Sequence, residues 1–139
     1  MADLIKTVDY FYITSTDKPG AGAKMLDPFR KAGVSFLAVH AFPAGKNRVQ
    51  VDFVPAKNSA FLRAARGARL RVSAKKKAFL VQGSDRAGAL AGVMAKLGAA
   101  KINVTAVTGL CAGKQRFALI FWVKPKDQRA AARALGARG

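Results

Sequence analysis

Two short turns carry the residue types best suited to binding chemistry. Residues 17–21, Asp-Lys-Pro-Gly-Ala, and residues 85–89, Asp-Arg-Ala-Gly-Ala, each separate an apolar, strand-like segment from a helical pattern. A helix that begins there presents free backbone N–H groups and the positive end of its dipole, which suit a carboxylate. The glycine lets a ligand approach the backbone closely, and Asp85 could receive an ammonium group. Together these groups could hold a small zwitterion.

Asn103 could complete such a site, because its amide donates and accepts hydrogen bonds at once. Each of these residues also has a purely structural interpretation. Asp17 and Asp85 could cap helices, the two glycines could serve only the turns, and Asn103 could satisfy the start of a strand.

Catalysis has little support in the sequence. The single histidine, His40, lies in an apolar strand, which favours a structural role. The single cysteine, Cys111, excludes an internal disulfide and a cysteine-rich zinc site, and is expected to be a plain packed thiol. The seven acids include no obvious acid/base pair. We therefore expect neither an enzyme nor a cofactor or metal site.

The two turns belong to an internal repeat with an offset of 68 residues. Residues 38–39, Ala-Val, recur at 106–107, and Ala-Gly-Lys at 44–46 recurs at 112–114. Phe53 matches Phe121 in the same register. No gap is needed, so we interpret the chain as two copies of one unit, a first domain of residues 1–75 and a second of 76–139.

The elements that position the turns follow the same order in both copies. Apolar periodicity and turn residues predict a β-α-β-β-α unit, with a fourth strand around Leu70 and Val72 in copy one only. The order is that of an α+β ferredoxin-like fold, an antiparallel sheet with helices on one face. The predicted elements are strands at about 8–14, 34–42, 47–54, 78–82, 102–110 and 115–123, helices ending at Gly33 and Gly98, and helices at about 58–66 and 127–135.

The copies also differ. Pro28 should kink or split the first helix of copy one, and Asp27 could cap its second piece. Copy two has little or no fourth strand, so residues 3–8 or a second protein chain should cover its sheet edge. Strand 117–123 is apolar on both faces, which predicts contact with another sheet or subunit and favours a dimer.

The charge supplies the main alternative function. The formal net charge is +18, and residues 56–78 hold eight basic side chains and no acid. Such a field attracts polyanions, but strand 116–123 lacks the RNA-recognition signature. Nucleic acid is therefore a possible but not favoured partner. No apolar run approaches the ~20 residues of a membrane span, and no cleavage-site pattern is present at the N-terminus, so we expect a cytoplasmic protein without a membrane partner.

Both turns resemble the loop between the first strand and first helix of ACT domains, and residues 98–107, Gly-Ala-Ala-Lys-Ile-Asn-Val-Thr-Ala-Val, resemble the family's second strand. The resemblance covers about 8–66 and 78–135. It implies a regulatory module that binds an amino acid or other small ligand between domains, and whose domains pair side by side. The implied ligand-binding residues are Asp85, Gly88, Ala89, Leu90, Ile102 and Asn103 in copy two, and Asp17, Gly20, Ala21, Gly22 and Ser35 in copy one.

The favoured function is thus a ligand sensor that forms a homodimer. A regulatory subunit that docks on a metabolic enzyme is an alternative with the same ligand prediction. Copy one has Ser35 where copy two has Asn103, so the second copy is the stronger candidate for ligand binding.

Overall fold

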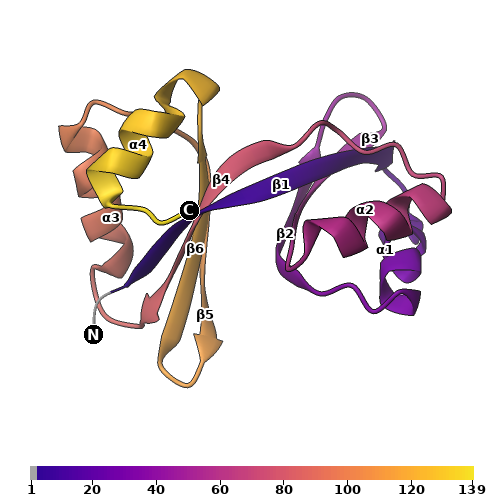
Figure 1. The fold of residues 1–139 in the computed structure, drawn as a ribbon, viewed down its shortest axis with the longest axis horizontal. Helices are drawn as coiled ribbons and strands as arrows, with labels where there is room; N and C mark the ends of the chain where they lie inside the picture. Colours follow the sequence, from indigo (N-terminus) through magenta and orange to yellow (C-terminus); the bar gives the residue numbers. More distant parts are fainter. Residues whose placement is uncertain (1–2) are drawn as a thin grey trace. The chain divides into compact units, whose positions relative to one another are not determined.

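A computed structural model describes residues 3–139 (Figure 1). Backbone contacts divide the chain into two compact units. The first unit is Asp9–Lys76, and the second unit is Lys77–Gly139 together with the N-terminal segment through Val8. Each is an α+β, ferredoxin-like unit in which two helices cover one face of an antiparallel sheet. The predicted fold class is confirmed.

In the first unit the strand order is β2-β3-β1, and both neighbouring pairs are antiparallel. Strand β1 extends further toward the N-terminus than the predicted 8–14, and its residues through Val8 belong to the second unit. The elements are β1 (Leu4–Thr16), α1 (Ala21–Lys31), β2 (Phe36–Pro43), β3 (Arg48–Pro55) and α2 (Asn58–Gly67).

In the second unit the order is β4-β6-β5, again antiparallel. The elements are β4 (Lys76–Ser84), α3 (Ala89–Ala99), β5 (Val104–Gly113), β6 (Arg116–Val123), a 3-10 turn η1 (Pro125–Asp127) and α4 (Gln128–Leu135). The 68-residue offset reappears in the bounds, since α3 begins and ends 68 residues after α1, and β6 after β3. The repeat inferred from sequence is therefore a structural repeat.

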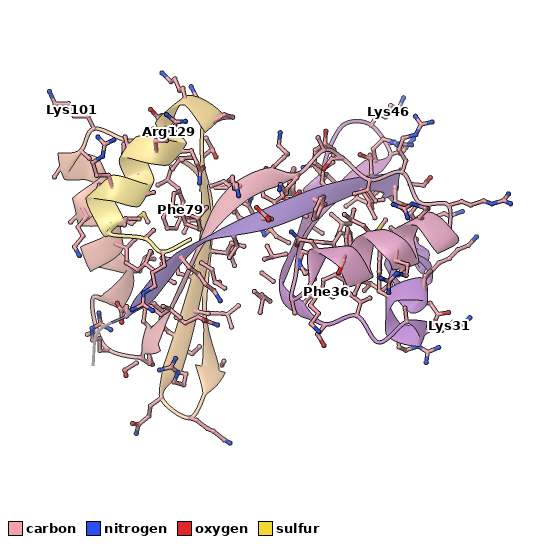
Figure 2. All side chains as sticks on the ribbon, in the orientation of Figure 1. Lys31, Phe36, Lys46, Phe79, Lys101 and Arg129 are labelled. Atoms are coloured by element: carbon pink, nitrogen blue, oxygen red, sulfur yellow. The ribbon has the colours of Figure 1, made fainter. Side chains whose placement is uncertain are left out.

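An aromatic cluster fills the first core. Phe29 of α1 and Phe61 of α2 stack with ring centroids 4.8 Å apart, and Phe53 of β3 is 5.5 Å from Phe29. All three rings are fully buried. The ring of Phe36 on β2 packs edge to face against the ring of Phe29. Phe36 is labelled in Figure 2. The burial of these aromatic side chains therefore stabilises α1 and α2 more than their intrinsic helix propensity does.

The second core is largely aliphatic. Leu97 and Phe121 occupy the positions that Phe29 and Phe53 hold in the first copy, and Phe79 stacks on Phe121 at 5.1 Å. Figure 2 shows Phe79 between the sheet and the helices, while Lys101 points away from the ribbon. Ile120 and Trp122, on the opposite face of β6, are also buried. Both apolar faces of this strand are thus shielded from solvent.

Pro28 does not split α1. The helix runs unbroken from Ala21 to Lys31, because burial of Phe29 on its inner face outweighs the lost hydrogen bond. The idea that Asp27 caps a second helical piece is therefore wrong. Its carboxylate instead pairs with Arg30 at 2.9 Å and Lys31 at 3.1 Å, one turn further along.

The predicted stop at Gly98 is also wrong, since Gly98 lies inside α3. The helix ends at Ala99, and Lys101 adopts the left-handed conformation (φ 59°) that closes it. Lys101 is the repeat counterpart of Gly33, which has φ 69° after α1. The backbone geometry is thus retained without the glycine.

The predicted fourth strand of copy one, around Leu70 and Val72, is not a regular strand. The segment still lies beside β1, because the Ser73 N–H donates to the Tyr12 carbonyl at 3.0 Å. In return the Tyr12 N–H donates to Ser73 Oγ at 2.9 Å, not to a backbone carbonyl. The Ser73 side-chain oxygen thus takes the place of the backbone carbonyl that would accept this hydrogen bond in a regular β-ladder.

Residues 3–8 cover the open sheet edge of copy two. This was one of the two alternatives that the sequence predicted. In strand order β1 neighbours β4. The Thr7 N–H also donates to the Arg138 carbonyl at 2.7 Å, and the Arg138 N–H donates to the Ile5 carbonyl at 2.9 Å. Ile5 packs on the second core.

Gly83 of β4 leaves the space that Asp3 and Phe117 occupy. A Cβ at Gly83 would lie 2.8 Å from the Phe117 ring and would overlap the Asp3 carboxylate. We expect Gly83→Ala to displace Asp3 and to lower the free energy of unfolding by about 1–3 kcal/mol, measured by chemical denaturation. Gly109→Ala is the matched control, because the nearest atom to its Cβ would be at an ordinary 3.5 Å. Equal stability of the two variants would contradict this account.

Candidate functional site

The turn before α3 has an unusual helix start. Gly88 is the N-cap in the left-handed conformation (φ 81°), and no side chain caps the helix. Gly20 does the same before α1 with φ 84°. The alternative that Asp85 and Asp17 cap these helices is therefore wrong, because each aspartate lies three residues before the glycine that takes the N-cap position. A positive φ favours glycine, so the turn itself requires this residue.

The start of α3 leaves backbone donors available. The Ala89 N–H donates to the Arg86 carbonyl at 3.3 Å, and the Gly92 N–H to the Gly88 carbonyl at 3.1 Å. Within residues 3–139, no acceptor is found for the N–H groups of Leu90 and Ala91. Ala89 is buried, whereas Leu90 is 44% exposed. An anionic group could therefore reach two N–H donors at the positive end of the helix dipole.

Asp85 is exposed and is held between two parts of the β5–β6 hairpin. Its N–H donates to the Gln115 carbonyl at 2.7 Å. The Asp85 carboxylate raises the pKa of the Cys111 thiol through hydrogen bonding and through its negative charge. Cys111 is exposed, so the expectation of a packed thiol is wrong. Cys111 lies on the edge strand β5, whose last five residues are all exposed.

Arg86, inside the same turn, was not singled out by its sequence. Its guanidinium makes a two-pronged contact with the Asp3 carboxylate at 2.9 and 3.1 Å, and a third bond to the Ser84 carbonyl at 2.9 Å. Its Cζ also lies 5.8 Å from the centre of the Phe117 ring. The hydrogen bond from Arg86 lowers the pKa of Asp3. No short-range pattern could have found this pair, because the partners are 83 residues apart.

Ile102 and Asn103 lie at the other end of α3. Ile102 is buried, and its N–H closes the helix by donating to the Leu97 carbonyl at 2.9 Å. Asn103 is exposed and precedes β5. An 11-residue helix is about 16 Å long. The second unit therefore does not bring Asn103 next to Asp85 and Gly88.

The first unit repeats this arrangement. The Asp17 N–H donates to the Asn47 carbonyl at 2.9 Å, as Asp85 does to Gln115. Gly20 caps α1, which begins at Ala21 and Gly22, and Ser35 follows the far end of the helix. The Ser35 carbonyl accepts from the Ala56 N–H at 2.9 Å. Each unit thus presents two separated half-sites.

The hairpin strands β2 and β5 are the sheet edges. Among the described strands, each pairs with one neighbour only. Val107 and Leu110 on β5 are 42% and 57% exposed. Their repeat counterparts Val39 and Phe42 on β2 are 47% and 37% exposed. Apolar side chains on an unpaired edge favour association with another strand.

His40, predicted to be structural, is half-buried on β2 opposite Asp52 of β3, with the Phe42 ring 5.6 Å away. Among residues 3–139, no three His, Cys, Asp or Glu side chains gather as a metal site. Across the same residues, every helix is too short or too polar to cross a membrane.

Comparisons with known proteins identify the fold. No protein-family model matches this chain, and no curated protein matches it. A solved protein from Bacteroides thetaiotaomicron is similar with a TM-score of 0.77 and 12% identity, over 96% of this chain and 92% of its own. The regulatory subunit of aspartate kinase from Thermus thermophilus, in its ligand-free form, has a TM-score of 0.65 and 17% identity, over 98% and 95%. The corresponding subunit from Thermus flavus has 0.60 and 17%, over 97% and 94%.

The Cys111 thiol reports on Asp85. Because the Asp85 carboxylate stabilises the protonated thiol and raises its pKa, removal of the carboxylate charge lowers that pKa. We expect Asp85→Asn to speed alkylation of Cys111 by iodoacetamide several-fold at mildly alkaline pH, where more thiolate is then present. Asp17→Asn makes the same exchange in the other unit and should leave the rate unchanged. A rate in Asp85→Asn equal to that of the unaltered protein would show that the contact is absent in solution.

Proposed function

We propose that this chain is a non-catalytic regulatory module that binds a small carboxylate ligand, an amino acid, at the turn before α3. The observation that carries the proposal is the pair of N–H donors of Leu90 and Ala91 at the start of α3, directly after the turn that carries the exposed Asp85. The N–H groups suit the α-carboxylate of an amino acid, and Asp85 suits its ammonium group. The solved regulatory subunits that share the fold support a regulatory role.

The second half of the site comes from a second copy of the chain. A homodimer with two-fold symmetry pairs equivalent strands antiparallel. Pairing two β5 edges in this way would set the Asn103 end of one strand beside the Cys111 end of the other, next to Asp85. The amide of Asn103 would then contact a ligand held by the Gly88 turn. The exposed side chains of Val107 and Leu110 would become the apolar part of that interface.

This arrangement gives the ligand a regulatory effect. A ligand held by two chains binds the dimer and not the separate monomers, so it shifts the association equilibrium. Ligand binding would thereby change which surfaces a partner enzyme meets. Docking on a metabolic enzyme is the partner proposal that fits, because two of the solved structures of this fold are regulatory subunits of aspartate kinase.

The ligand prediction is tested by a thermal-shift screen of the common amino acids. At least one should raise the melting temperature, because a ligand at about 100 times its Kd adds about 2.7 kcal/mol to the stability of the folded state. Asp85→Asn and Asn103→Ala should each remove most of that shift, through loss of the ammonium and amide contacts.

Asp17→Asn is the control for this screen, and the shift should persist in it. A shift that disappears only in Asp17→Asn would assign the ligand to the first unit. An absence of any stabilising amino acid would contradict the proposal, and so would an undiminished response in both Asp85→Asn and Asn103→Ala.

The interface prediction is tested separately by sedimentation. Leu110→Lys places a charge at the centre of the proposed β5 interface, and we expect it to weaken self-association by at least about tenfold. Leu26→Lys makes the same exchange at an exposed position on α1, 41% exposed, and should leave association unchanged. Equal association of both variants and the unaltered chain would place the contact elsewhere or show that the chain is a monomer.

A further inference from the structure

The face of the first sheet that carries no helices contains a hollow of about 490 Å³. On β1, Phe11 and Ile13 point into the aromatic core, so the alternate residues Tyr12 and Thr14 point to the opposite face. The volume falls within the ordinary range for small-ligand sites. Its lining residues all belong to the first unit: Tyr12, Thr14, Arg48, Arg71, Val72 and Ser73.

Backbone register and one serine build this hollow. Thr16 pairs with Arg48, the first residue of β3, so the Arg48 side chain shares the face of Tyr12 and Thr14. On the other side, Ser73 holds the segment after α2 against β1. Its Oγ accepts from the Tyr12 N–H and donates to the Ala74 carbonyl, both at 2.9 Å. Ser73 is therefore a positioning residue, and it sets Arg71 at the rim.

The lining is cationic and rich in donors. It contains two guanidinium groups and three hydroxyl groups but no carboxylate. In the part of the chain that the structure describes, neither Arg48 nor Arg71 makes an ion pair. Their charges are thus available to a ligand, as are the hydroxyls of Tyr12 and Thr14.

One acid on this face of the sheet, Asp52, already accepts a hydrogen bond within the first unit. Asp52 lies opposite Tyr12 on β3, and it is 5% exposed. Its Oδ1 accepts a hydrogen bond from Gln50 Nε2 at 2.9 Å. Burial raises the pKa of Asp52. Asp52 does not line the hollow, so the charged groups in the lining are the two guanidinium groups.

We propose that this hollow binds a phosphate monoester, with Arg48 and Arg71 holding its oxygens from two sides and Tyr12 donating a hydrogen bond from the floor. Guanidinium groups match phosphate in geometry and can each make two parallel hydrogen bonds to it. A zwitterionic amino acid fits less well, because no carboxylate lines the hollow to receive its ammonium group. The site is separate from the turn at Gly88 and selects a different chemical class.

The test is calorimetric titration of the full chain with glycerol phosphate, inorganic phosphate and a single-stranded oligonucleotide as separate probes. Glycerol phosphate should bind saturably with one site per chain, and more tightly than inorganic phosphate, because the hollow is larger than one phosphate group. Arg48→Gln and Arg71→Gln should each weaken it at least about tenfold, the loss expected for a charge-assisted hydrogen bond. Tyr12→Phe keeps the ring and should weaken it less.

Arg66→Gln is the matched control, since Arg66 is exposed on α2 outside the hollow and carries the same charge. Glycerol phosphate affinity should be unchanged in this variant. An equal loss in Arg66→Gln would overturn the proposal in favour of a general basic surface. So would oligonucleotide binding that excludes glycerol phosphate and depends on Arg66. Absence of saturation, or equal affinity for inorganic phosphate, would also overturn it.

Discussion

The need to give a sheet edge hydrogen-bonding partners is the constraint on which the rest of this structure depends. In each copy, one edge of the first strand pairs with the hairpin. The opposite edge of that strand requires another hydrogen-bonding neighbour. The first unit meets it with Ser73, whose side-chain oxygen stands in for a backbone carbonyl. The second unit meets it with the start of β1, which also bonds Arg138. The same fold thus tolerates two different closures, and both leave the hairpin strands as open edges.

The charge distribution separates general attraction from local recognition. The 25 basic side chains far outnumber the 7 acids, and some of the acids are held in ion pairs, as Asp3 is by Arg86 and Asp27 by Lys31. A field of this kind draws in many anions, but physiological salt screens it over about 8 Å. Discrimination between anions therefore has to come from fixed geometry. The Ser73 hydroxyl, which fixes its segment against β1, and the left-handed glycines at 20 and 88 supply such fixed geometry.

Much of the fold was predictable because most elements occur twice in the sequence, so the pattern of one copy supports the prediction for the other. The helix at 89–99 and the strand at 116–123 follow from periodicity that recurs 68 residues earlier. What escaped prediction depends on contacts remote in sequence. Pro28 is tolerated because Phe29 is buried by two other aromatic rings, and Arg86 is fixed by Asp3. The Gly88 turn was recognisable, but the distance that separates it from Asn103 is set by the length of α3 and the direction of β5.

Strand β1 passes from the second unit to the first at Val8, and the chain returns to the second unit at Lys77. The first unit is therefore an insertion within the second. The internal contacts of the inserted unit lie within the single stretch Asp9–Lys76, whereas the bond between Thr7 and Arg138 joins residues separated by nearly the full length of the chain. Closing long loops slows folding. During synthesis the inserted unit can complete its core while the surrounding unit still awaits its last residues, so the polypeptide assembles from its middle outward.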